Sequence, residues 1–273
     1  MEQMNMPRIK LTSQIALNLS GTSSNLLVVG PTGSGKTFLL CHLLLSLYGQ
    51  RCVVYVVDFK QGDFYGVVRW HTKDGADYCA STADEFEKFL DLIRETLRIR
   101  FQKLASPNTT FGRVATDLVD DWRPVYLFVD EYSAALAPLL TNKETKSQAN
   151  RINAKMLEII QLIRQAGGGV ILSFQKMAAD ILPTAITDNM AKIGLGNLST
   201  QSKVQLFGKA TNLPIIDLSQ QGVGYLQRPE DPIPIPFQAP RLNADKIQEI
   251  AETLTGFNGI DGNVSTTLDG EKT

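Results

Sequence analysis

The chain has 273 residues, of which 43% are apolar, enough to bury one large hydrophobic core. Its formal net charge of −1 excludes an overall basic surface, so nucleic acid would have to contact a local patch or several subunits around a shared axis. No segment has the roughly 18 uninterrupted apolar residues of a membrane span. No apolar segment follows "MEQMNMPRIK", so we do not expect a signal peptide. We therefore expect a cytoplasmic protein without direct membrane insertion.

Residues 1–24 are interpreted as an N-terminal extension. After them, four short runs of β-branched and aromatic residues predict strands. Such nearly unbroken apolar runs are typical of strands that are covered on both faces of a parallel sheet. The four runs are "NLLVVG" (25–30), "CVVYVVD" (52–58), "PVYLFVDE" (124–131) and "GVILSFQ" (169–175).

Two amphipathic helices are predicted between these strands. The first begins at a capping box, Thr82 to Glu85, and the second ends at the glycines 167–169. Apolar residues recur at helical spacing in each. In the first helix they are Phe86, Phe89, Leu90, Ile93, Leu97, Phe101 and Leu104, and in the second Ile152, Met156, Ile159, Ile160 and Ile163. The alternation of strands and helices predicts an α/β doubly wound domain.

The pattern changes after Pro183. "KIGLGNLS" (192–199) and "GVGYLQ" (222–227) predict short strands. "RPEDPIPIPFQAP" (228–240) has too many prolines for a central strand, so we expect it to lie extended across the surface. For residues 243–273 we expect a short helix and then a disordered tail, because the residues after Thr255 are rich in Gly, Asn, Asp and Thr.

Three cysteines, Cys41, Cys52 and Cys79, have no metal-binding spacing and cannot all pair. Each lies among apolar or aromatic neighbours, which predicts buried free thiols. This is the pattern of a protein in a reducing compartment.

A glycine-rich loop follows the first predicted strand. "GPTGSGKT" (30–37) fits G-x-x-x-x-G-K-[ST] at every fixed position, and a leucine-rich helix follows it. Glycines let successive backbone N–H groups surround a phosphate, and the helix N-terminus adds partial positive charge. With the lysine, the threonine and both flanking elements present, a merely flexible turn is the weaker interpretation. The predicted nucleotide-binding residues are Gly30, Pro31, Thr32, Gly33, Ser34, Gly35, Lys36, Thr37 and Phe38.

Within this loop, Lys36 is expected to contact the β- and γ-phosphates and Thr37 to ligate Mg²⁺. Two acids end the strand "VYLFVDE". Asp130 is placed to hold the Mg²⁺ shell and Glu131 to polarise an attacking water, unless Glu131 merely begins a solvated loop. A carboxylate beside water favours hydrolysis over transfer to a second metabolite, as in a small-molecule kinase.

The base of the nucleotide is predicted from an absent motif. A guanine reader has the pattern Asn-Lys-x-Asp, whereas "TNKET" has Thr145 in the position of the aspartate. The sequence therefore favours ATP.

Two further polar residues are candidates for the catalytic site. Gln175 ends the strand "GVILSFQ", where an amide can contact the γ-phosphate. Arg164 ends the second amphipathic helix. It is either a solvated cation favoured by the helix dipole or an arginine finger that reaches a neighbouring subunit's nucleotide.

Between Asn25 and about Leu242, a series of motifs occurs in a distinctive order. They are "GPTGSGKT", "VVDFKQGDFYG" (with Asp58, Lys60, Gly62 and Tyr65), "RIRFQKL" (with Phe101 where a tyrosine is usual), "LFVDEYSAAL", "LIRQAGGGVILSFQK" and "APRL". This order resembles the FtsK/SpoIIIE–HerA family of ring-forming DNA pumps, which includes the coupling ATPases of conjugative elements. The resemblance places Arg164 in the finger position, Gln175 in the sensor position and "APRL" in the closing strand.

The resemblance implies a P-loop NTPase of the additional-strand catalytic-glutamate type, with a mostly parallel sheet flanked by helices and a motor domain over residues 25–242. It further implies a homohexamer that hydrolyses ATP and translocates double-stranded DNA in plasmid transfer or chromosome segregation. Some features depart from the family. Ser173-Phe174 replaces Ala-Thr, Lys176 replaces an arginine, and neither membrane segments nor a C-terminal winged helix are expected. Recruitment to a membrane would then need a channel or relaxase partner.

Contacts of a DNA motor go mainly to phosphates, because it must grip every sequence. The candidate cations are Lys143, Lys146, Arg151, Lys176, Lys192 and Lys203, each with a solvated loop charge as the alternative. Two other functions stay open: a secretion ATPase that moves protein substrates, and a nucleotide-regulated adaptor with little turnover. Glu131 argues against the adaptor, which needs no water-polarising acid.

Overall fold

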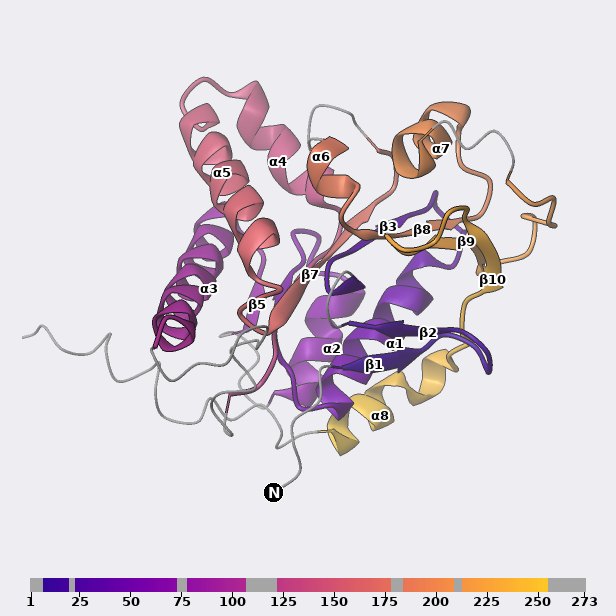
Figure 1. The fold of residues 1–273 in the computed structure, drawn as a ribbon, viewed down its shortest axis with the longest axis horizontal. Helices are drawn as coiled ribbons and strands as arrows, with labels where there is room; N and C mark the ends of the chain where they lie inside the picture. The colour runs from indigo at the N-terminus through magenta and orange to yellow at the C-terminus, as the bar shows by residue number, and fades with distance from the viewer. Residues whose placement is uncertain are drawn as a thin grey trace, which may run out of the picture.

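The computed structural model describes residues 7–19, 23–72, 78–106, 122–177, 184–208 and 213–254 (Figure 1). The strands in these ranges are β1 (Arg8–Lys10), β2 (Ala16–Asn18), β3 (Leu26–Val29), β4 (Val53–Val57), β5 (Cys79–Ala80), β6 (Val125–Val129), β7 (Gly168–Phe174), β8 (Ala191–Leu195), β9 (Val223–Gln227) and β10 (Ile235–Gln238). The helices are α1 (Lys36–Gly49), α2 (Asp63–His71), α3 (Ala83–Leu104), α4 (Tyr132–Thr141), α5 (Lys146–Leu162), α6 (Thr184–Thr187), α7 (Thr200–Phe207) and α8 (Ile247–Thr253), with a 3₁₀ turn η4 (Ala244–Lys246).

In the described part of the chain, eight strands form one sheet in the order β10-β9-β8-β3-β7-β6-β4-β5. The strands from β8 to β5 pair in parallel, whereas β9 and β10 are antiparallel to their neighbours. Strand β7 lies between β3 and β6, as the additional-strand arrangement requires. The predicted α/β fold with a mostly parallel sheet is therefore confirmed.

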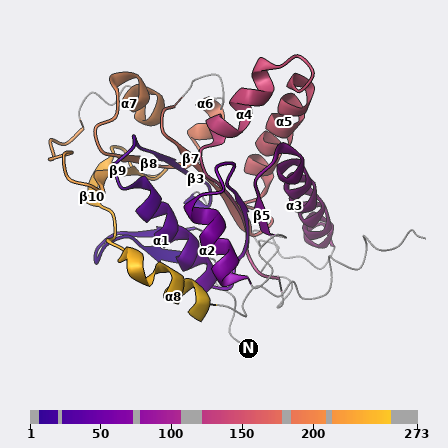
Figure 2. The same ribbon diagram turned by 180° about the vertical axis from the view of Figure 1, so that it is seen from behind.

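Both faces of the sheet are buried, because successive side chains of a strand point to opposite faces. On β3, Leu27 and Val29 join the core under α3, α4 and α5. The alternate residues Leu26 and Val28 join the core under α1, α2 and α8. Figures 1 and 2 show these two groups of helices on opposite sides of the sheet. This double coverage explains why the strands read as continuous apolar runs.

Helices α3 and α5 pack side by side on one face. The predicted capping box starts α3, since the Thr82 side chain accepts from the Glu85 backbone and the Glu85 side chain accepts from the Thr82 backbone. The predicted apolar residues of α5 are buried, as are those of α3 up to Leu97. Phe101 and Leu104, at the same spacing, are only half-buried.

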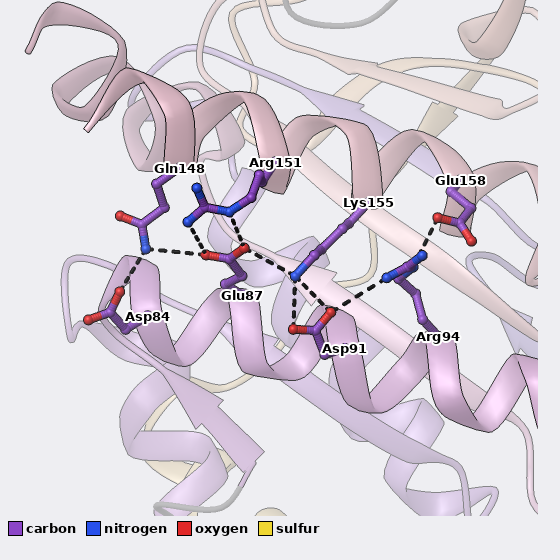
Figure 3. Close-up of polar contacts among 8 residues, drawn as sticks. All are labelled: Asp84, Glu87, Asp91, Arg94, Gln148, Arg151, Lys155 and Glu158. Atoms are coloured by element: carbon purple, nitrogen blue, oxygen red, sulfur yellow. Dashed lines mark hydrogen bonds and ion pairs between the residues drawn. The ribbon is translucent and has the colours of Figure 1, made fainter. Parts of the chain in front are cut away.

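A ladder of polar contacts also joins these two helices (Figure 3). Its members lie at spacings of three, four and three residues, which place them on one face of each helix. They are Asp84, Glu87, Asp91 and Arg94 on α3, and Gln148, Arg151, Lys155 and Glu158 on α5. Glu87 is its most enclosed acid, with a side chain that is 15% exposed.

Glu87 makes the stability of this helix pair depend on pH. Hydrogen bonds from Arg151 and then Lys155 lower the pKa of Glu87 from 4.5 to about 2. Because the folded pKa is depressed, this stabilisation is present above pH 4.5 and is lost as the pH falls towards 2. Between these values, the free energy of unfolding in urea should fall more steeply for the wild type than for Glu87→Gln.

The control for this comparison is Glu95→Gln on α3, whose acid pairs with Arg98 but is 48% exposed. It should change the slope less, because solvent screens exposed pairs. Equal slopes for the wild type and Glu87→Gln would contradict the assigned role of Glu87.

The C-terminal part continues the sheet and then crosses its α1 face. The proline-rich segment 228–240 is not a central strand, as expected. Its residues Ile235–Gln238 form the edge strand β10, which pairs with β9 alone. The prediction that "APRL" (239–242) is the closing strand is wrong by four residues, since β10 ends just before it. Helix α8 follows and packs against α2 (Figure 2).

Other predictions concern the termini and the cysteines. Residues 8–18 form the hairpin β1–β2, and Ile9 and Leu17 are buried in the core under α1. The predicted disordered tail after Thr255 lies outside the described residues. Cys41, Cys52 and Cys79 are all buried and free, as predicted, and burial raises the pKa of the Cys41 and Cys79 thiols to about 12. No helix among the described residues is long and apolar enough to cross a membrane.

Candidate active site

The carboxyl ends of the parallel strands bring the predicted site residues together. The loop 30–37 follows β3, Asp130 and Glu131 follow β6, and Gln175 follows β7. Beside this edge of the sheet lies a cavity of about 680 Å³, lined by the loop, Asp130, Gln175, α2 and residues that begin the C-terminal segment. Open parallel sheets bind ligands at this edge.

The glycines of the loop are required by its conformation. Gly33 and Gly35 have φ values of 81° and 89°, which side chains on L-residues rarely allow. A Cβ atom on Gly35 would also lie 2.8 Å from the backbone N of Gly222, at the start of β9. The N–H of Gly222 donates to the carbonyl of Ser34 at 2.8 Å. The loop is therefore held against β9 before Lys36 begins α1.

Lys36 lies at the floor of the site and is 9% exposed. Its Nζ donates to Glu131 Oε2 at 3.0 Å and to Ser173 Oγ at 3.3 Å. These contacts join the glycine loop to the ends of β6 and β7. Thr37, the next residue, is exposed and lines the cavity.

Glu131 is held in a strained conformation. Its φ of 53° and ψ of 60° are left-handed, which costs a non-glycine residue about 1–2 kcal/mol. The side chain is anchored nevertheless: Oε1 accepts from Ser133 Oγ at 3.1 Å and from the backbone N of Gln175 at 2.9 Å. At 6% exposed, Glu131 is not the solvated loop residue of the alternative interpretation. Its catalytic role stays a prediction.

Ser173 is a site residue that the sequence motifs identified only as a difference from the family's usual alanine. Its hydroxyl is fully buried, donates to Asp130 Oδ1 at 2.7 Å, and accepts from the backbone N of Glu131 at 3.0 Å and from Lys36 Nζ at 3.3 Å. One hydroxyl thus uses its single donor and both acceptors. Burial raises the pKa of Asp130, and the Ser173 hydrogen bond opposes that rise. The available signal was a polar residue inside an otherwise apolar strand.

Asp58, at the end of β4, shapes another wall of the cavity. Its carboxylate accepts from the backbone N–H groups of Lys60 at 3.1 Å, Gly62 at 2.9 Å and Tyr65 at 3.2 Å. These bonds fix the turn that leads into α2, and Lys60 and Gly62 line the cavity. Asp58 is therefore a structural residue of the site, and the motif "VVDFKQGDFYG" is explained by this turn.

Arg164 lies apart from the other site residues. It is exposed in the turn between α5 and β7, at the amino end of β7, whereas Gln175 follows the carboxyl end. Seven strand residues separate the two ends by about 23 Å. Arg100 holds this turn, since its Nη1 donates to the carbonyls of Ala166 at 2.8 Å and Gly167 at 3.2 Å. Arg164 is thus far from the glycine loop of its own chain.

The candidate DNA-binding cations divide into three groups. Arg151 pairs with Glu87, and Lys192 pairs with Asp188 at 3.2 Å and is 8% exposed, so both are engaged within the chain. Lys203 is half-buried on α7. The others, Lys143, Lys146 and Lys176, are exposed.

No protein-family model matches the sequence, and no curated protein matches it either. Three solved structures share its fold at 20%, 20% and 18% identity. They are the pCW3 conjugation coupling protein TcpA in its monomer form with ATPγS (TM-score 0.72), the cytoplasmic domain of the Thermomonospora curvata type VII secretion ATPase EccC (0.63), and ATPases 2 and 3 of the same EccC with a signal sequence peptide (0.59). The aligned regions cover 93%, 94% and 93% of this chain.

The chain spans 71% of the TcpA chain, but only 32% and 47% of the two EccC chains. These likenesses confirm the fold that the sequence resemblance implied. The chain has the α/β fold of P-loop ATPases, and its glycine loop, Asp130 and Glu131 lie at the edge of the sheet where such a fold binds its ligand.

Proposed function

We propose that this protein is an ATPase that uses ATP hydrolysis to translocate double-stranded DNA. The observation that carries the proposal is the contact between Lys36 and Glu131, with Asp130 joined to both through Ser173. A glycine loop alone binds phosphate. An acid beside its lysine adds a group that can accept a proton from water.

The donors around the cavity fit ATP with Mg²⁺. Lys36 and the loop backbone would hold the β- and γ-phosphates. Thr37 and Asp130 supply a hydroxyl and a carboxylate, the oxygen ligands that Mg²⁺ prefers, and both residues line the same cavity. When bound there, Mg²⁺ neutralises charge on the phosphates.

Hydrolysis in this site requires Lys36 to exchange partners. Its ammonium transfers its hydrogen bond from Glu131 to the γ-phosphate, which frees the Glu131 carboxylate. Glu131 then accepts a proton from water as the water oxygen attacks the γ-phosphorus and the bond to the bridging oxygen of ADP breaks. The backbone N–H of Gln175 donates to Glu131, and Gln175 lines the cavity, where its side-chain amide would contact the γ-phosphate.

We further propose that the protein works as a ring, with a hexamer as the expected form. The position of Arg164 supports this proposal. Arg164 is exposed beside the amino end of β7, away from its own glycine loop, and is therefore available to a neighbouring subunit's nucleotide. The exposed Lys143 and Lys146, at the connection from α4 to α5, are candidates for contact with DNA phosphates. A membrane channel or a relaxase is the expected partner of a cytoplasmic ring.

The structural neighbours support two kinds of transported substrate, DNA and protein. One is a conjugation coupling protein, which favours DNA, and another was solved with a signal sequence peptide, which favours a secretion ATPase that moves proteins. We propose DNA because TcpA has the higher TM-score of the two, 0.72 against 0.59, and is matched over 71% of its own length against 47%. The exposed Lys143 and Lys146 also offer cations for phosphate contacts.

The purified chain tests these alternatives by its ATPase rate with long duplex DNA, with single strands, with a signal peptide and without additions. Duplex DNA should raise the rate, and Lys36→Ala should abolish it in every condition, which excludes a contaminating ATPase. Stimulation by the peptide alone would support the secretion function instead. A Lys36-dependent rate near zero throughout would support an adaptor. Mass measurement with an ATP analogue checks the ring.

A further inference from the structure

The cavity beside the glycine loop has a second, apolar end. Phe38 and Cys41 of α1, Val67 and Trp70 of α2, and Ala244 and Ile247 near the C-terminal end of the described chain line it. We propose that the purine base of the bound nucleotide stacks on the indole of Trp70, with Ala244 and Ile247 forming part of the same base site. This inference rests on the proposed ATPase function and names the base-binding part of its site.

The first argument is the position of this apolar end relative to Lys36. Phe38 and Cys41 lie two and five residues after Lys36 on α1. At 1.5 Å per residue they are about 3 and 7.5 Å further along the helix axis. A nucleotide whose phosphates lie at Lys36 must extend beyond the loop to accommodate its ribose and base. A cavity of about 680 Å³ is within the range of pockets that hold small-molecule ligands.

The second argument is the shape of α2. Gly66 and Trp70 are four residues apart and therefore lie on the same face of the helix. A Cβ atom on Gly66 would lie 3.7 Å from Cη2 of Trp70, so the indole lies over a position without a side chain. Trp70 is 37% exposed and borders the cavity. A large aromatic side chain that is partly exposed beside a phosphate loop suits a flat aromatic ligand, and each base that stacks on such a ring gains affinity.

The third argument concerns the C-terminal segment, which is predicted above to lie outside the motor domain. Helix α8 packs against α2, and the ring Nδ1 of His71, the residue after Trp70, is 3.4 Å from the carbonyl of Ala251. The same segment supplies Ala244 and Ile247 to the cavity. Base binding would therefore join α1, α2 and the residues after 242 into one site.

Tryptophan fluorescence of the full chain gives a direct test. The sequence has two tryptophans, so Trp122→Phe leaves Trp70 as the single reporter. ATP should change the emission of Trp70, whereas inorganic tripolyphosphate, which has no base, should bind without changing it. Calorimetry on the same variant measures both affinities. ATP binding without any change in emission would contradict stacking on Trp70.

Affinity measurements on variants give a second readout. Trp70→Ala should weaken ATP about tenfold, the effect of losing one stacked base, and should leave the affinity for tripolyphosphate unchanged. Trp70→Phe, which keeps a ring, should recover most of that loss. Ile250→Ala is the matched control, because Ile250 is also 37% exposed, on α8, but does not line this cavity.

The outcomes separate this inference from the proposed function. If the wild type binds neither ATP nor tripolyphosphate, the nucleotide site itself is wrong. If it binds both, and Trp70→Ala binds ATP as tightly as the wild type, the base site is overturned while the ATPase stands. Equal weakening of ATP and tripolyphosphate in Trp70→Ala would show a general disturbance of the site and would also contradict the proposal.

Discussion

Glu131→Gln is expected to bind ATP at least as tightly as the wild type and to hydrolyse it about 10²- to 10⁴-fold more slowly, the usual contribution of a general base. The amide keeps the shape of the carboxylate, and its oxygen can still accept from Ser133 Oγ and the backbone N of Gln175. It cannot accept a proton from water. Because the charge that pairs with Lys36 is removed, ATP no longer has to displace it.

Single-turnover kinetics separate the two effects, since they measure binding and phosphate release independently. Ser133→Ala is the matched control, because it removes one hydrogen bond to Glu131 while keeping the carboxylate; it should lose far less rate. Rapid single-turnover hydrolysis by Glu131→Gln would remove Glu131 from the catalytic role and leave the site without its proposed base.

Arg164→Ala is expected to preserve ATP affinity and to lose about 10³–10⁵ in the rate of hydrolysis, the range of an arginine finger. Arg164 lies in the turn before β7, and the strand extends about 23 Å from that turn to its end at the cavity. It therefore has no role in binding nucleotide to its own chain. Arg98→Ala on α3, which removes an exposed arginine from an ion pair, should leave the rate unchanged.

Mixed rings test whether Arg164 acts on a neighbour. In a mixture of Arg164→Ala and Glu131→Gln subunits, some interfaces combine an intact Glu131 on one chain with an intact Arg164 on the next. Such interfaces should recover part of the activity that each variant lacks alone. A mixture that stays inactive, although mass measurement shows that mixed rings form, would mean that Arg164 does not act in trans.

The fold was predictable because its signals are local. A parallel strand buried on both faces must be apolar throughout, so the runs before the glycine loop and before Asp130 identify β3 and β6 by composition alone. The loop is equally local, since glycine at positions 33 and 35 is the chemical requirement of a positive φ. The closing strand was predicted four residues too late, because its position was taken from the family motif "APRL" and not from a local pattern. The strand β10 is an edge strand whose position depends on its pairing with β9.

Other features depend on residues far apart in the chain. Ser173 becomes a site residue only because β7 lies between β3 and β6, which brings its hydroxyl to both Lys36 and Asp130. Arg151 was a candidate for DNA contact, but Glu87, 64 residues away, already occupies its guanidinium. The local pattern shows a polar residue at position 173, but it does not show which partners Ser173 or Arg151 contacts.

Short motifs were enough to predict the kind of chemistry, because the residue types of a phosphate loop and of a carboxylate at a strand end follow from the groups they bind. Which side chains meet follows from the three-dimensional fold. The fold brings Glu131 to Lys36, places Arg164 at the amino end of β7, and brings the C-terminal segment and Trp70 to the same cavity. Hydrogen bonds and stacking act over a few ångströms in space. The order of strands in the sheet, which no local stretch of sequence encodes, therefore decides which of them form.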